Sequence, residues 1–165
     1  MTLLVADGLG HGHLAHTAAE EAVRLFRKRP DAPLTEIIAT LNTGLKSTRG
    51  AAVSVARLDY GRGVVNYAGI GNIAGAVFSA DCTHKMVSLN GTAGLAVRHI
   101  QAFEYPLPRQ ARVVLVSNGI TSGWSLLGYP GLLRSSPALA AGVIYRDFQR
   151  KRDDATVLVA TGADG

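Results

Sequence analysis

The sequence predicts an α+β domain in which helices pack on the faces of antiparallel sheets. Its 165 residues are 47% hydrophobic and only 18% charged, which is the composition of a folded domain with a substantial core. Helical spacing of apolar residues recurs near both ends of the chain, and short strand-like runs rich in Val, Ala and aromatic residues fill the middle. The resulting order is strand, two helices, many strands, helix and strand, without a linker or repeat, so we expect one layered domain.

The chain opens on an apolar run, Leu3–Ala6, that predicts a buried strand. Asp7 ends this run, and glycines follow at positions 8, 10 and 12. Helical spacing then extends over residues 13–29 and stops at Pro30, because the residue before a proline disfavours helix. A carboxylate between a strand and a glycine loop suits a divalent cation, and the N–H groups of such a loop suit a phosphate. A turn whose aspartate only caps the helix is the alternative.

The remaining elements follow from the same signals. A second helix begins near Pro33 and keeps one apolar face as far as Leu45, so the first two helices are expected side by side over a sheet. A third helix begins at Ser136-Pro137, an N-cap followed by proline, and runs to Phe148. Strands separated by turn residues are expected at 51–58, 63–68, 74–78, 84–89, 100–105, 112–117 and 155–160. The first four of these strands are expected to form an antiparallel meander.

Charge, cysteine content and hydropathy limit the cellular location and the classes of partner that we expect for this protein. The net charge of +5 is mostly scattered, as on a solvated surface, and no nucleic-acid-binding motif accompanies it. Cys82 is the only cysteine, which excludes an internal disulfide and favours a reducing compartment. No apolar run approaches the roughly 18 residues of a membrane span, and the first residues, which lack a basic segment, do not lead us to expect a signal peptide. We therefore expect a cytoplasmic protein without nucleic-acid or membrane partners.

Histidines near the glycine loop do not predict a zinc site. His11, His13 and His16 do not share one helix face, and no cysteine or further histidine joins them. His11 directly follows the loop glycines and is a candidate proton carrier. Arg49, ahead of a strand-rich segment, is either a bidentate ligand for phosphate or a surface charge at a helix end.

Three segments share one design, in which an apolar strand adjoins acids or small polar residues. Asp7-Gly8 follows the first strand, Asn118-Gly119 follows the strand expected at 112–117, and Asp153-Asp154 precedes the last strand. Acids that meet at strand ends from distant parts of a chain suit a two-cation site, because carboxylates offset the repulsion between the cations. These segments therefore predict a two-metal site able to hydrolyse a phosphate ester.

The same segments carry a resemblance to a known family. The matching motifs lie in the family's order and cover nearly the whole chain: Val5-Ala6-Asp7-Gly8-Leu9-Gly10-His11-Gly12, Arg49-Gly50-Ala51-Ala52, Tyr67-Ala68-Gly69-Ile70-Gly71-Asn72, Gly91-Thr92-Ala93-Gly94, Val116-Ser117-Asn118-Gly119-Ile120 and Arg152-Asp153-Asp154-Ala155-Thr156-Val157. With them the sequence resembles the PPM (type 2C) metal-dependent protein serine/threonine phosphatases, within their bacterial SpoIIE-like and RsbX-like branch. The resemblance implies an α-β-β-α sandwich over residues 1–165, without the family's first N-terminal strand or strands, and a site for two Mn²⁺ or Mg²⁺ ions.

The resemblance also implies roles for individual residues. Asp7 would bridge both metals, Gly8 would offer its backbone carbonyl to one of them, and Asp153 would be a further ligand, so that Asp7 and Asp153 carry catalysis. Asp154 would be a structural neighbour of that ligand. Asn118 stands where the family has an aspartate, and its uncharged amide would hold a metal more weakly. The family's earlier strand carries another acid, which this sequence does not contain.

By the same resemblance, the protein is expected to hydrolyse phosphoserine or phosphothreonine with a metal-activated water and without a covalent phosphoenzyme. Its expected substrate is a phosphorylated regulatory protein of the anti-sigma-factor antagonist type, in bacterial partner switching or stress signalling. Asn118 and the absent acid support an alternative, a degenerate domain that binds a phosphoprotein with little or no turnover. A third hypothesis is a scaffold domain without metal, in which Asp7 only caps a turn.

Overall fold

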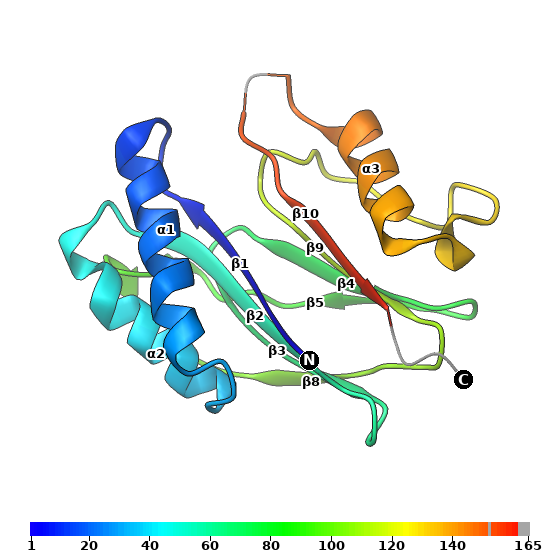
Figure 1. Ribbon diagram of the computed structural model, residues 1–165, viewed down its shortest axis with the longest axis horizontal. Coiled ribbons are helices and arrows are strands. Elements are labelled where there is room, and N and C mark those ends of the chain that lie inside the picture. Colours follow the sequence, from blue (N-terminus) through cyan, green and yellow to red (C-terminus); the bar gives the residue numbers. More distant parts are fainter. Residues whose placement is uncertain (152, 162–165) are drawn as a thin grey trace.

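Two four-stranded antiparallel sheets form the centre of the computed structural model, which describes residues 1–151 and 153–161 (Figure 1). The first sheet has the order β1-β2-β3-β8 and consists of β1 (Thr2–Gly8), β2 (Ala51–Asp59), β3 (Val64–Ile70) and β8 (Phe103–Pro106). The second has the order β10-β9-β4-β5 and consists of β10 (Val157–Thr161), β9 (Arg112–Val116), β4 (Ala74–Phe78) and β5 (Thr83–Met86). A short hairpin of β6 (Gly91–Thr92) and β7 (Ala96–Val97) adjoins the start of β2.

Helices cover the outer face of each sheet (Figure 1). α1 (His13–Lys28) and α2 (Leu34–Gly44) pack on the first sheet, and α2 continues into the short helical turn η1 (Leu45–Ser47). α3 (Pro137–Phe148), preceded by η2 (Leu132–Arg134), packs on the second sheet. The layers are therefore helix, sheet, sheet and helix, which confirms the predicted α-β-β-α sandwich.

The inner strands β2, β3, β4 and β9 are largely apolar and buried on both faces. On β2, Val53 and Val55 face α1 and α2, whereas Ala56 and Leu58 face the second sheet. Tyr67 on β3 is fully buried between the sheets, where its hydroxyl shares a 2.7 Å hydrogen bond with Ser88. A strand buried on both faces is a short continuous apolar run, which is the pattern in this part of the sequence.

The predicted helices are confirmed, with ends close to those expected. α1 ends at Lys28, just before Pro30, and α2 begins directly after Pro33. At the start of α3, the Ser136 hydroxyl accepts a 3.2 Å hydrogen bond from the backbone N–H of Leu139. Ser136 is therefore the N-cap that the sequence predicts, with proline at the first helical position.

The predicted meander is wrong. β2 and β3 form one hairpin in the first sheet, whereas β4 and β5 form another in the second. The link 71–73 carries the chain from one sheet to the other. Gly71 has a φ of 94°, and a Cβ on it would lie only 2.8 Å from the Cβ of Ala52, so the crossing needs glycine. Turn residues and strand-like runs predict hairpins, but they do not specify which sheet a hairpin joins.

The segment after β5 also departs from the prediction. β5 ends at Met86, and β8 occupies Phe103–Pro106, each shorter than the strands expected at 84–89 and 100–105. The backbone N–H of Val87 donates to the Tyr105 hydroxyl (2.9 Å) in place of a strand partner. Among the residues described, none of the helices has both the length and the apolar character needed to cross a membrane.

Candidate active site

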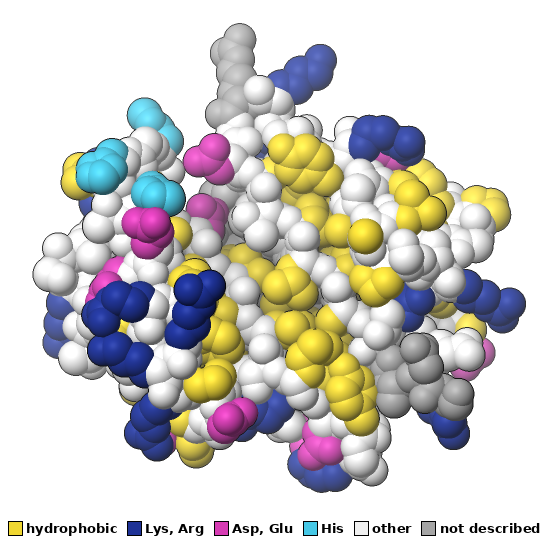
Figure 2. All heavy atoms as spheres, viewed as in Figure 1, with side chains coloured by type: hydrophobic (Ala, Val, Ile, Leu, Met, Phe, Trp, Pro, Cys, Tyr) yellow, Lys and Arg dark blue, Asp and Glu magenta, His cyan; other side chains and the backbone are white. Residues whose placement is uncertain are grey.

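The three polar segments predicted from the sequence meet in one cleft. Asp7 and Gly8 end β1, Asn118 follows β9, and Asp153 and Asp154 lie just before β10; all five line a cleft of about 360 Å³. The cleft lies at the end of the sandwich where β1 ends and β10 begins (Figure 1). The space-filling view shows acidic side chains between these two elements (Figure 2). Each sheet therefore contributes one part of the cleft.

Backbone packing holds the part of the cleft contributed by β1. A Cβ on Gly8 would lie only 1.9 Å from the carbonyl oxygen of Ala15, so the chain after Asp7 packs directly on the first turn of α1. The N–H of Leu9 donates to the carbonyl of Gly50 (2.9 Å), which joins the glycine loop to the start of β2. Asp7 is thus fixed by main-chain contacts on both sides of the loop.

The second sheet holds Asn118 and the two aspartates in the same way. Ser117 and Thr156 form a backbone hydrogen bond of 3.1 Å, and the Ser117 hydroxyl accepts a second one of 3.0 Å from the N–H of Thr156. A Cβ on Gly119 would lie 2.0 Å from the carbonyl oxygen of Asp154. The loop after β9 and the segment before β10 therefore form one packed unit.

Negative charge accumulates at the cleft. Burial raises the pKa of Asp7, and the negative charges of Asp153 and Asp154 raise it further. In the described part of the chain, none of these carboxylates forms an ion pair with lysine or arginine. A divalent cation would relieve this repulsion, because it is a strong local positive charge.

The donor atoms fit a hard cation. Carboxylate, amide and backbone carbonyl oxygens are the ligands of Mg²⁺ and similar ions, and Mg²⁺ keeps several waters. Within residues 1–151 and 153–161, no three His, Cys, Asp or Glu side chains converge into a ready-made metal site. The carboxylates of Asp7 and Asp153, the amide of Asn118 and the carbonyl of Gly8 are therefore an open set that water would complete.

His11 and Arg49 are both exposed and do not line the cleft. Arg49 lies at its edge, because its Nη1 is 3.1 Å from the position that a Cβ on Gly10 would take, and Gly10 does line the cleft. Histidine side chains gather over the start of α1 (Figure 2), where the imidazole of His16 lies 3.2 Å from the carboxylate of Glu20. The predicted roles of His11 and Arg49 stay predictions.

Sequence reasoning missed part of the cleft wall. Asn90 and Thr92 line it, and Asn72 does as well. Asn90-Gly91 and Gly71-Asn72 are each typical of a turn, and neither carries a charged side chain. Their shared signal is a small polar residue beside glycine, which is also the signal of an ordinary turn.

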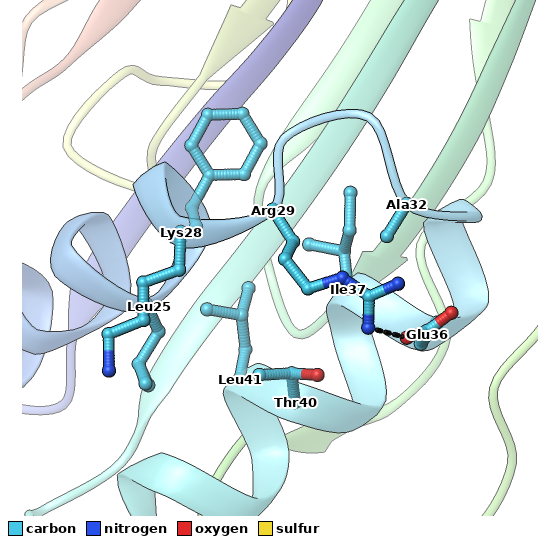
Figure 3. A pocket seen from close by; sticks show the side chains of 9 residues that line it. Leu25, Lys28, Arg29, Ala32, Glu36, Ile37, Thr40 and Leu41 are labelled. Atoms are coloured by element: carbon cyan, nitrogen blue, oxygen red, sulfur yellow. Dashed lines mark hydrogen bonds and ion pairs between the residues drawn. The ribbon is translucent and has the colours of Figure 1, made fainter.

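A second hollow, of about 110 Å³, lies between α1 and α2 (Figure 3). Its wall is mainly apolar and includes Leu25, Ile37 and Leu41. Arg29 and Glu36 at this hollow form an ion pair with each other. Because these charges are already paired, the cleft between the sheets is the stronger candidate for chemistry.

Solved structures with the same fold include signalling proteins and phosphatases. A protein from work on the bacterial stressosome, "a modular system that has been adapted to control secondary messenger signaling", is 27% identical; its TM-score is 0.86, and the match covers 96% of this chain and 83% of that one. RsbX in complex with magnesium is 18% identical with a TM-score of 0.84, and the match covers 98% of this chain and 81% of RsbX. The Mycobacterium tuberculosis serine/threonine phosphatase PstP/Ppp is 12% identical with a TM-score of 0.73, and the match covers 99% of this chain and 88% of that phosphatase. The last two likenesses show a shared fold.

The family comparison covers almost the whole chain. A search of curated protein sequences gives no match. The family described as stage II sporulation protein E (SpoIIE) matches residues 1–162, which include every motif and every predicted site residue. The resemblance inferred from the sequence is confirmed, and the chain belongs to the SpoIIE family of PPM-type phosphatase domains.

Proposed function

We propose that this protein is a divalent-metal-dependent phosphatase that acts on phosphoserine and phosphothreonine in a regulatory protein. The observation that carries the proposal is the cleft itself. Asp7 from one sheet and Asn118 and Asp153 from the other line a single hollow, although they are far apart in the sequence. Acidic oxygen donors that repel one another beside a glycine loop are suited to a metal-assisted phosphoryl reaction.

In this proposal, Asp7 and Asp153 hold the metal through their carboxylates, Gly8 through its carbonyl and Asn118 through its amide oxygen. When bound, Mn²⁺ or Mg²⁺ supplies polarisation of the phosphoryl oxygens and a lower pKa for water. The chain itself supplies fixed orientation, because Gly8 and Gly119 pack against backbone carbonyls on the two sides of the cleft. Asp154 keeps the segment before β10 negatively charged.

The partner in this proposal is a phosphorylated regulatory protein of the anti-sigma-factor antagonist type. The support is the 27% identical structure from work on the bacterial stressosome, which spans nearly the whole chain. Arg49 at the edge of the cleft would bind the phosphate with its guanidinium group. A phosphorylated protein fits an open cleft better than a small metabolite does, because only its phosphorylated residue enters the cleft and the rest of the polypeptide remains outside it.

The neutral side chain at position 118 favours a second function, a phosphoprotein-binding module with little turnover. Asn118 is exposed in the cleft, where a carboxylate would add a negative ligand. Hydrolysis of p-nitrophenyl phosphate and of a phosphoserine peptide, each with Mn²⁺, Mg²⁺ or EDTA, separates the two functions. Metal-dependent turnover by the wild type supports the phosphatase, and its absence in every condition supports the module.

Asn118→Asp is expected to strengthen metal-dependent hydrolysis. A third carboxylate at the metal raises its affinity, because affinity follows the number of charged ligands. We expect half-maximal activity at a metal concentration on the order of tenfold lower than in the wild type. A metal titration of p-nitrophenyl phosphate hydrolysis measures this shift, with Asn66→Asp on β3, outside the cleft, as the control. Identical titrations for wild type and Asn118→Asp would remove Asn118 from the ligand set.

Mn²⁺ is expected to raise the melting temperature, and to raise it more at pH 7.5 than at pH 5. A ligand at 100 times its Kd stabilises the native state by about 2.7 kcal/mol, or about 5–10 °C for a domain of this size. Because the pKa of Asp7 is raised in the folded state, protons compete with the metal for this carboxylate up to a higher pH than at an ordinary aspartate. Thermal scans with and without Mn²⁺ measure the shift. Equal shifts at both pH values would contradict a carboxylate site.

The raised pKa of Asp7 also determines the direction in which the stability of the metal-free protein changes with pH. A folded carboxyl with a raised pKa holds its proton more tightly than the unfolded chain does, so it favours folding most at low pH. That contribution declines as the pH rises from the ordinary aspartate value through the raised one. The carboxylate of Asp7 at neutral pH therefore destabilises the metal-free protein.

A further inference from the structure

Two large apolar side chains are exposed beside the cleft. Leu9 lines the cleft and is 49% exposed, and Leu95, between β6 and β7, is 59% exposed. Leu9 donates its backbone N–H to the carbonyl of Gly50, and a Cβ on Gly50 would lie 3.1 Å from the Cγ of Leu95. Single exposed leucines are ordinary on protein surfaces. These two differ because both are tied to residues at the cleft: Leu9 itself lines it, and the backbone N–H of Leu95 donates to the carbonyl of Thr92, which also lines it (3.1 Å).

The turn that carries the second leucine is firmly held. Ala51 and Ala93 exchange backbone hydrogen bonds of 3.0 and 2.9 Å, and the N–H of Gly94 donates to the Oδ1 of Asn42 on α2 (2.9 Å). A Cβ on Gly94 would lie 2.7 Å from the carbonyl oxygen of Leu45, so the turn packs tightly on the end of α2. A surface fixed in this way loses little conformational entropy when a ligand binds.

Arg49 adds positive charge to the same rim. Its side chain is exposed next to Gly10, and it belongs to none of the ion pairs found among the described residues. A phosphorylated segment is negatively charged, so a cation beside the cleft attracts it. Apolar contact and positive charge therefore occur together at the point where a polypeptide would leave the cleft.

We propose that Leu9, Leu95 and Arg49 form a substrate rim that binds the polypeptide around the phosphorylated residue and selects a large apolar side chain next to it. This inference rests on the proposed function and specifies its substrate more closely. The occupant is a phosphorylated protein segment, because the rim is continuous with the cleft and carries charge complementary to phosphate. Leu95 is then a specificity-determining residue that lies outside the metal site.

Paired peptides test the proposal without requiring turnover. Two fluorescent peptides carry a non-hydrolysable phosphonate analogue of phosphoserine, flanked on both sides by leucine in one and by glycine in the other. Fluorescence anisotropy in Mg²⁺ gives their dissociation constants. We expect the wild type to bind the leucine peptide about tenfold more tightly, because a leucine that packs on Leu9 and Leu95 removes apolar surface from water. Leu95→Ser is expected to remove the preference.

Matched variants make the result decisive. Leu139→Ser, on α3 over the second sheet and 55% exposed, should keep the preference, and Leu95→Met should retain most of it. Equal affinity of wild type for both peptides, or an unchanged preference in Leu95→Ser, would overturn the proposal. A change in oligomeric state of Leu95→Ser with an unchanged preference would overturn it in favour of a second copy of the chain on the rim. Hydrolysis of p-nitrophenyl phosphate by the wild type tests the proposed function separately, so the two failures are distinguishable.

Discussion

Asp7→Asn is expected to abolish metal-dependent phosphate hydrolysis and to raise the melting temperature of the metal-free protein. The carboxylate is half-buried beside Asp153 and Asp154, so replacing it with a neutral amide of the same shape relieves repulsion and desolvation. The same change removes the most enclosed carboxylate of the proposed metal site. Activity assays in Mn²⁺ and thermal scans in EDTA measure the two effects. Their opposite directions separate a lost ligand from a damaged fold.

Asp81→Asn is the matched control for this prediction. Asp81 is exposed in the turn between β4 and β5 and does not line the cleft, so its replacement should change neither activity nor melting temperature. The Mn²⁺-induced rise in melting temperature should disappear in Asp7→Asn and persist in Asp81→Asn. Undiminished metal-dependent hydrolysis by Asp7→Asn would show that the cleft is not the active site.

Gly8→Ala is expected to destabilise the fold by about 3 kcal/mol or more, at the upper end of the usual cost of overpacking. Its Cβ would lie 1.9 Å from the carbonyl oxygen of Ala15, and that neighbour is main chain rather than a flexible side chain. Either β1 or the first turn of α1 must shift, and Asp7 shifts with it. We therefore expect a melting temperature at least about 6 °C lower, together with loss of metal-induced stabilisation.

Gly142→Ala provides the control for the glycine substitution. Gly142 lies in α3, and a Cβ there would meet nothing within 4 Å. Alanine in an open helical position stabilises by about 0.5–1 kcal/mol relative to glycine. Opposite signs for the two glycine variants are the expected result. A wild-type melting temperature for Gly8→Ala would mean that α1 and β1 can separate freely.

The sequence predicts the local elements well because their signals are local. Pro30 and Pro33 separate α1 from α2, and Ser136 caps α3, so each boundary depends on residues within one turn. The assignment of hairpins to sheets is not local. The link at Gly71 decides it, and glycine there indicates a turn of any kind. The order of elements therefore predicted helices packed on antiparallel sheets, whereas the four-layer α-β-β-α order came from the resemblance to a family.

The candidate site was predictable where a charged residue stands at the end of a strand. Asp7 and Asp153 carry that signal, and both line the cleft. Thr92 and Asn90 carry none, because a polar residue beside glycine is common in turns. Leu95 was also unpredictable as a surface residue, since an apolar residue after a strand suggests burial, whereas its side chain is 59% exposed. Surface roles of apolar residues depend on tertiary contacts that a pattern does not contain.

Gly8 and Gly119 place the cleft through contacts with the carbonyl oxygens of Ala15 and Asp154, and these contacts involve no side chain. Such a site depends little on the exposed side chains of α1, because a substitution on the outer face of that helix leaves the carbonyl of Ala15 where it was. The positions most sensitive to substitution are Gly8 and Gly119, where no side chain fits. Over evolutionary time, the geometry of this cleft would therefore be preserved by the exclusion of atoms at two glycines, while most of the neighbouring sequence remains free to change.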